Sequence, residues 1–182
     1  RDVPPPNMII ITQYVLEENP SGVFLVKSEE QHVCPICGCK LNRFGRRNRN
    51  KIEKSGIKKI LSIQRLRCCH CKRIHHELPD CLVPYKHYDQ ESIEEVLSTE
   101  GINEITVAAD NSTILRWKSW FASRINHFIG CLRAITFKLK KIVVDSGACL
   151  ESPLQGIYQF VGDAAKWLAR VVRPVANSNN WK

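Results

Sequence analysis

Apolar residues in the second half of the chain recur every three or four positions, which is the spacing of amphipathic helices. Ile114, Trp117 and Phe121 share one such face and are expected in the core. The pattern predicts four helices: one that follows an N-cap at Asp89 and ends at Gly101, and others over residues 113–121, 125–143 and 153–174.

The first half of the chain has strand signals instead. Residues 57–66 are rich in β-branched side chains and partly alternate between apolar and polar, as in a half-buried strand. The apolar run Met8–Ile11 is shorter than the core of a signal peptide, and no stretch approaches the roughly 20 apolar residues that span a membrane. We therefore expect a cytoplasmic protein with no membrane partner. Met8 is a candidate translation start.

Nine cysteines are present, and four of them form two CxxC pairs. Cysteines rarely form disulfides in the cytoplasm, and two CxxC pairs can supply four thiolates to one tetrahedral ion. The spacing predicts one structural Zn²⁺ bound by Cys34, Cys37, Cys68 and Cys71, in a zinc ribbon whose arms are the intervening residues. Because four thiolates leave no coordination position for water, the site is not expected to be catalytic, and the protein is not expected to be an enzyme.

The neighbouring residues leave the ligand set partly open. Two further cysteines could replace a ligand in another register, and three histidines are within reach: Cys39, Cys69, His70, His75 and His76. The remaining cysteines are isolated along the chain and are expected to pack as small hydrophobic residues: Cys81, Cys131 and Cys149.

The formal net charge of +9 is unevenly distributed. Residues 40–76 carry thirteen basic and one acidic side chain, residues 77–111 one basic and nine acidic, and residues 112–182 eleven basic and three acidic. Two basic blocks on either side of an acidic one are typical of two surfaces that face one polyanion, and the partner we expect is double-stranded DNA.

The densest basic run lies between the two CxxC pairs, on the arms of the predicted ribbon. A solvated loop would have the same composition. The predicted DNA contacts in this run are Arg43, Arg46, Arg47, Arg49 and Lys51.

A helix-turn-helix is predicted after the ribbon. The helix that follows Asp89, a turn, and a second helix with a polar and cationic N-terminal face have the order of a motif that places its second helix in the major groove. The predicted contacts are Ser112, Thr113, Arg116 and Lys118. An ordinary helical hairpin would produce the same periodicity, and the apolar stripes that follow could also support a homodimer.

The expected fold class is α+β, with a small N-terminal β zinc ribbon followed by an all-α helix-turn-helix bundle. The expected segments are an N-terminal strand or leader over residues 1–29, the ribbon with its basic insert over 30–82, the helix-turn-helix domain over 83–145, and a C-terminal amphipathic helix with a frayed tail over 146–182.

The segment from Leu66 to Tyr88, with its strings RIHHELPD and LVPYKHY, resembles an uncharacterised bacterial family known as DUF6431. The likeness extends back to Cys34 and forward to Trp117. Proteins of this family combine a zinc ribbon with a helix-turn-helix and are often labelled transposase-like. The resemblance therefore implies a mobile-element or DNA-associated setting, with the four CxxC cysteines as metal ligands and no established activity. We expect the protein to be associated with the bacterial nucleoid in the cytoplasm. Leu115 stands where a second basic residue is expected before the arginine that follows, which weakens the phosphate contact expected there.

The leading functional hypothesis is a non-catalytic DNA-binding protein of a mobile element or of transcription. The first alternative is the end-binding fragment of a transposase. Only Asp145, Glu151 and Asp163 follow the helix-turn-helix as candidate acidic metal ligands, too few for a nuclease core. The second alternative is a zinc-ribbon module that binds proteins, which the dense basic run disfavours because protein interfaces are depleted in lysine.

Overall fold

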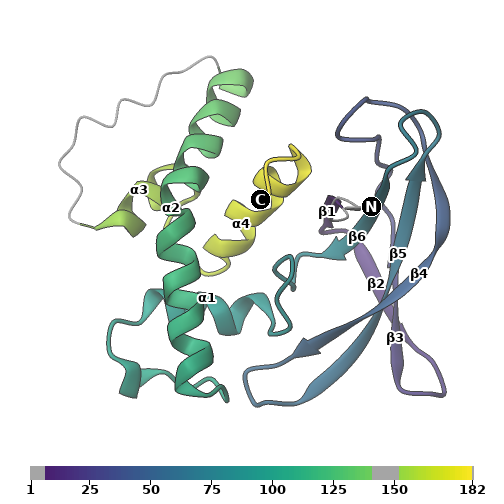
Figure 1. Cartoon of the computed structure of the whole chain (residues 1–182). Helices are drawn as coiled ribbons and strands as arrows, with labels where there is room; N and C mark the ends of the chain where they lie inside the picture. Colours follow the sequence, from purple (N-terminus) through teal and green to yellow (C-terminus); the bar gives the residue numbers. More distant parts are fainter. Residues whose placement is uncertain (1–6, 141–151, 182) are drawn as a thin grey trace, which may run out of the picture.

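A computed structural model describes residues 7–140 and 152–181. Its strands form one mixed sheet, and its helices lie beside that sheet (Figure 1). The strands are β1 (Asn7–Ile11), β2 (Tyr14–Glu18), β3 (Val23–Ser28), β4 (Leu41–Ile52), β5 (Lys58–Cys68) and β6 (Ile74–Pro79). The helices are α1 (Gln90–Ser98), the short 3₁₀ helix η1 (Ile102–Glu104), α2 (Asn111–Lys140), α3 (Pro153–Val161) and α4 (Trp167–Asn177).

The long strand β5 organises the curled sheet. Its strand order is β1-β6-β5-β3-β2, and β4 pairs antiparallel with β5 along the length of both strands. The opposite edge of β5 is shared, because β3 pairs with its first half and β6 with its second. The pairs β1–β6 and β3–β5 are parallel, and the remaining pairs are antiparallel. Figure 1 shows β4 and β5 as two long strands that run side by side, with the turn that joins them near α1.

The expected small β ribbon followed by an all-α helix-turn-helix bundle is wrong. Residues 7–28, expected as a single N-terminal strand or a leader, contribute three of the six strands. The helices α1 and α2 are separated by residues 99–110, whereas the turn of a helix-turn-helix has about three or four residues. The physical reason is that residues 7–28 enlarge the sheet, and that the helices, which pack on one another, join it through α4 against β1, so that both parts share one core.

The basic run between the CxxC pairs is a strand of a hairpin, as predicted for the ribbon arms, and not the solvated loop that was the alternative. All of β4 is paired with β5, with a bulge at Phe44, where the register shifts between Arg43 and Gly45. Gly45 has a φ of +118°, a conformation that side chains with a Cβ rarely adopt, so the bulge depends on this glycine. The strand predicted over residues 57–66 is confirmed as β5.

Acidic residues cap three helices, which explains part of the acidic block in the sequence. The predicted N-cap Asp89 is confirmed, since its Oδ1 accepts the amide hydrogen of Ser92 at 3.0 Å. Asp110 accepts the amide of Thr113 at 2.8 Å at the start of α2. The Glu94 carboxylate on α1 accepts the amides of Lys166 and Leu168 at the start of α4. These carboxylates therefore stabilise helix N-termini and do not form a free connector.

The later helices differ from the predicted ones in their boundaries. The two helices expected over residues 113–121 and 125–143 are one helix, α2. The single helix expected from Pro153 is divided into α3 and α4 at Gly162, whose φ is +74°, and Pro174 lies inside α4 rather than at its end. Three residues named in the sequence analysis lie outside the described residues: Asp145, Cys149 and Glu151. The end of the helix predicted over residues 125–143 also lies outside them.

One hydrophobic core joins the sheet to the helices. It contains Ile10 and Ile63 from the sheet, Ile93 from α1, Trp117 from α2 and Val171 from α4, all 5% exposed or less. The core positions predicted at 114, 117 and 121 are confirmed as buried.

A pair of side-chain hydrogen bonds closes the edge of the sheet against α4. Asn177 accepts the Ile10 amide at 2.6 Å and donates to the Ile10 carbonyl oxygen at 3.0 Å, so that its side chain takes the place of a further strand beside β1. In the ranges that the structure describes, no helix combines the length and apolar character needed to cross a membrane.

Candidate metal centre and arginine face

The two CxxC pairs fold as matching turns at one end of the sheet. In the first, the Gly38 amide donates to the Cys34 carbonyl oxygen at 2.8 Å, and Gly38 has a φ of +71°. In the second, the residue at the same offset from the first cysteine is Lys72, which also has a positive φ, +61°. The turns are joined to the ends of β4 and β5, where Cys69 donates its amide to the Lys40 carbonyl oxygen at 3.1 Å.

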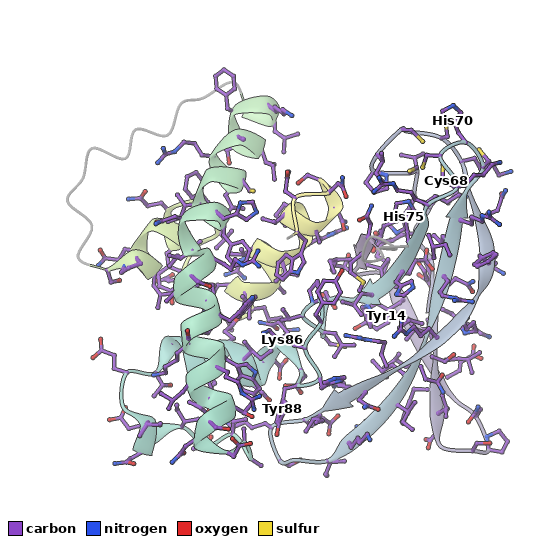
Figure 2. All side chains as sticks on the ribbon, viewed as in Figure 1. Tyr14, Cys68, His70, His75, Lys86 and Tyr88 are labelled. Carbon is purple, nitrogen blue, oxygen red and sulfur yellow. The ribbon has the colours of Figure 1, made fainter. Side chains whose placement is uncertain are left out.

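The turns bring the four predicted cysteines together. Sulfur–sulfur distances are 3.6 Å for Cys34–Cys71 and 3.4 Å for Cys37–Cys68, and all four sulfurs lie within 4.8 Å of one another. A tetrahedral ion with metal–sulfur bonds of about 2.3 Å needs sulfurs about 3.8 Å apart. The cluster therefore has the donor set and the spacing to bind one metal ion, and Figure 2 places it at the end of the sheet around Cys68.

Backbone amides favour the thiolate form of these cysteines. The amide of Cys39 donates to the Cys37 sulfur and is the main cause that lowers the pKa of the Cys37 thiol to about 6. Burial raises the pKa of Cys34, and the amides of Cys37 and Ile36 oppose that shift. Because only the thiolate binds a metal, amides that point at the sulfurs prepare the turns for an ion.

His75 is a neighbour of the cluster. Its Nε2 lies 3.4 Å from the Cys34 sulfur, its side chain is fully buried, and its Nδ1 has no hydrogen-bond partner. It belongs to neither group of possible metal ligands. A ring N–H that donates to a ligating thiolate fixes the orientation of that ligand, so we interpret His75 as a positioning residue for Cys34.

The ribbon residues predicted to contact DNA lie on both faces of β4. Arg43 and Arg46 point to the concave side of the sheet, into a hollow of about 690 Å³ that also contains Glu77. Arg46 is held there by bonds to the carbonyl oxygens of Val26 at 2.7 Å and Ser62 at 2.5 Å, with a third bond from its Nε to the Ser62 hydroxyl oxygen. Its guanidinium therefore bridges strands of the sheet.

Arg47 and Arg49 alternate to the opposite face, and the strand β5 adds two arginines that sequence analysis missed, Arg65 and Arg67. We call these four residues the arginine face. The guanidinium groups of Arg65 and Arg67 each lie 5.3 Å from the ring centre of Phe44, which the bulge leaves 41% exposed. Side chains two residues apart on a strand share a face, so the spacing of Arg65 and Arg67 on β5, opposite the basic residues of β4, could have identified both arginines from the sequence.

No residue of the arginine face forms an ion pair with a carboxylate in the described part of the chain. The Nε atoms of Arg49 and Arg65 are buried and have no hydrogen-bond partner. Burial, with smaller contributions from Arg47, Arg65 and Arg49, lowers the pKa of the adjacent His76 to about 4. The arginine face is therefore a concentration of positive charge without local compensation. By contrast, the predicted contact Lys51 is 3.3 Å from a Glu53 oxygen.

The contacts predicted on α2 are engaged within the protein. Ser112 and Thr113 donate their hydroxyl hydrogens to the Asp110 carboxylate. Arg116 donates to the Ser112 carbonyl oxygen and the Thr113 hydroxyl oxygen, and Lys118 donates to the Thr99 carbonyl oxygen at 2.7 Å. The structure does not bring these residues together with the arginines of β4.

One lysine connects the two basic regions. Lys86 lies between the sheet and the helices in Figure 2, and its ammonium is 4.3 Å from the ring centre of Trp120 on α2. Its carbonyl oxygen accepts a bond from Arg49 at 3.4 Å. Burial lowers the pKa of Lys86, and the positive charges of Arg116 and Arg124 add to the shift.

Comparison with known proteins identifies a family for this part of the molecule. The model of a domain of unknown function, DUF6431, matches residues 34–117. Residues 34–117 belong to the DUF6431 family. The DUF6431 region contains both cysteine turns, the arginine face, α1 and the first turns of α2, whereas β1, β2, β3, α3 and α4 lie outside it. No curated protein and no solved structure matches the chain.

Proposed function

We propose that this DUF6431 protein binds double-stranded DNA through its arginine face and that a zinc ion in the Cys34, Cys37, Cys68 and Cys71 cluster holds that face in place. The observation that carries the proposal is the group of four arginines that share one face without a carboxylate partner. Arginines without a carboxylate partner on a strand pair are suited to phosphate oxygens, which accept charge-assisted hydrogen bonds from guanidinium groups.

Zinc is the ion that best suits the donor set. Four thiolates in a tetrahedral arrangement are typical of structural zinc, and the soft sulfur donors disfavour magnesium and calcium. Such an ion would be closed to water, so we assign it a structural role and propose no catalytic activity. Its position at the ends of β4 and β5 supports a role in fixing the register of these strands.

The shape of the region favours contact with the DNA backbone. The twelve residues of β4 span roughly 40 Å at about 3.3 Å per residue, and the other edge of β5 is occupied by β3 and β6. A strand pair that is closed on one side is better placed to lie across phosphates than to enter a groove as an isolated ribbon. Lys86 would extend the contact toward α2.

A salt titration of DNA binding tests this proposal. We would measure fluorescence anisotropy of a labelled 20-bp duplex with the metal-loaded full chain between about 50 and 200 mM salt. We expect the logarithm of the association constant to fall linearly with the logarithm of salt concentration, by about 0.9 for each phosphate contact. The double variant R47Q/R67Q should bind more weakly and lose about two from that slope.

The matched control is K27Q/K138Q, which removes the same charge from two exposed lysines outside the arginine face. It should retain the slope of the wild-type protein. Equal losses in both double variants would mean that only net charge matters, and absence of binding at 50 mM salt would overturn the proposal. Far-UV circular dichroism and metal content would establish that each variant is folded.

A further inference from the structure

We infer that Cys37, Cys39 and His70 form a second metal site, which shares the Cys37 sulfur with the first. The Cys37 sulfur, the Cys39 sulfur and a ring nitrogen of His70 all lie within 4.8 Å of one another. The inference depends on the metal centre of the proposed function and is independent of DNA binding. Figure 2 shows His70 at the outer end of the sheet, beyond Cys68.

The backbone holds these three donors in place. The Cys34 amide donates to the Cys39 carbonyl oxygen at 2.9 Å, which fixes Cys39 beside the first turn. Cys69 is bonded to the Lys40 carbonyl oxygen at 3.1 Å, so its neighbour His70 lies opposite Cys39 on the paired chain. The two side chains therefore meet because the strand register continues beyond β4 and β5.

Cys39 and His70 are not needed by the first ion. The group of Cys34, Cys37, Cys68 and Cys71 already supplies four sulfurs to a tetrahedral centre. Cys39 and His70 are thus surplus donors of the types that zinc prefers, placed beside a sulfur that is itself partly exposed. A thiolate sulfur has further lone pairs and can therefore bridge two ions.

Charge favours a second cation at this position. A divalent ion with four thiolates has a formal charge of about −2, so the outer side of Cys37 attracts positive ions. A second divalent ion that binds the bridging sulfur, one more thiolate and a neutral imidazole reduces the net negative charge of the whole cluster. Two sulfurs and one nitrogen suit Zn²⁺, Co²⁺ or Cd²⁺. Water can complete the coordination.

Metal stoichiometry tests the inference. The full chain would be purified reduced, loaded with Cd²⁺ or Zn²⁺, and analysed by native mass spectrometry, with elemental analysis as a second readout. We expect two ions in the wild-type protein and one in both C39S and H70A. The control C81S, which changes a half-buried cysteine outside the cluster, should retain two ions.

Each other outcome has a separate meaning. One ion in the wild-type protein, with C39S unchanged, would overturn the second site and leave the first intact. Complete loss of metal in C39S would assign Cys39 to the first centre and would also overturn the inference. No metal in the wild-type protein would contradict the proposed zinc centre itself. Far-UV circular dichroism of each variant, recorded with one equivalent of metal, separates loss of a site from loss of the fold.

Discussion

The two ends of the molecule are held together in different ways. Around the cysteine turns, over residues 33–46 and 64–75, the buried side chains are Cys34, Leu66, Cys68 and His75, so two cysteines of the cluster and its histidine neighbour make up most of the buried set. The helical side, in contrast, buries aromatic and aliphatic residues along α2 and α4. The comparison teaches that the end with the cysteine turns buries little apolar surface of its own, so we expect its stability to depend on the ion proposed for the cluster.

Metal removal should have the largest effect and should act on one side of the molecule. Structural zinc in small peptides has an apparent binding free energy of order 10 kcal/mol, far more than any single side chain here. After chelation, or in C68S, we expect amides of residues 41–46 and 65–68 to lose protection while those of α2 and α4 retain it. Hydrogen exchange followed by mass spectrometry measures this difference. Equal loss of protection on both sides would show that the fold is one cooperative unit.

Loss of an aromatic core residue should affect the other side. Trp117 is 5% exposed, and its ring meets Tyr88 edge to face at 4.8 Å between ring centres. We expect W117A to lower the free energy of unfolding by about 3–5 kcal/mol, because it leaves a cavity in the core. Urea denaturation measures the loss, and the folded fraction should still bind metal at the wild-type stoichiometry. A loss below about 1 kcal/mol would contradict the assignment of Trp117 to the core.

A smaller change at Asn177 should weaken the link between the two sides. In N177A the amide and carbonyl of the fully buried Ile10 lose their side-chain partner. We expect the free energy of unfolding to fall by about 1–3 kcal/mol, the usual cost of an unpaired buried polar group. The exposed residue Asn48 provides the control N48A, which should stay close to the wild type in urea denaturation. No difference between the two variants would mean that α4 is held to β1 by apolar contacts alone.

Local sequence signals predicted the parts of the fold that depend on neighbouring residues. The Asp89 cap, the buried face at Ile114, Trp117 and Phe121, and the meeting of four cysteines from two short turns are all confirmed in the structure. Each depends on a fixed offset of two to seven residues within a helix or turn, or on a spacing that few other structures use.

The sheet could not be predicted in the same way. The basic residues of β4 resemble a solvated loop because their strand is stabilised by the partner β5 and not by their own propensity. Arg46 and Arg47 are adjacent in sequence, yet one is bonded to Val26 inside the hollow and the other points to the arginine face. Only the register of the strand pair decides which of them is available to a ligand.

The amino-acid sequence alone determined which cysteines gather, which helix faces are buried and where the positive charge is concentrated. The tertiary structure decided that residues 7–28 complete the sheet, that β1 pairs with the distant β6, and that four arginines share a face. The reason is that helix and turn signals are read over a few residues, whereas a strand acquires its partner, its direction and its two faces from residues far away in the chain.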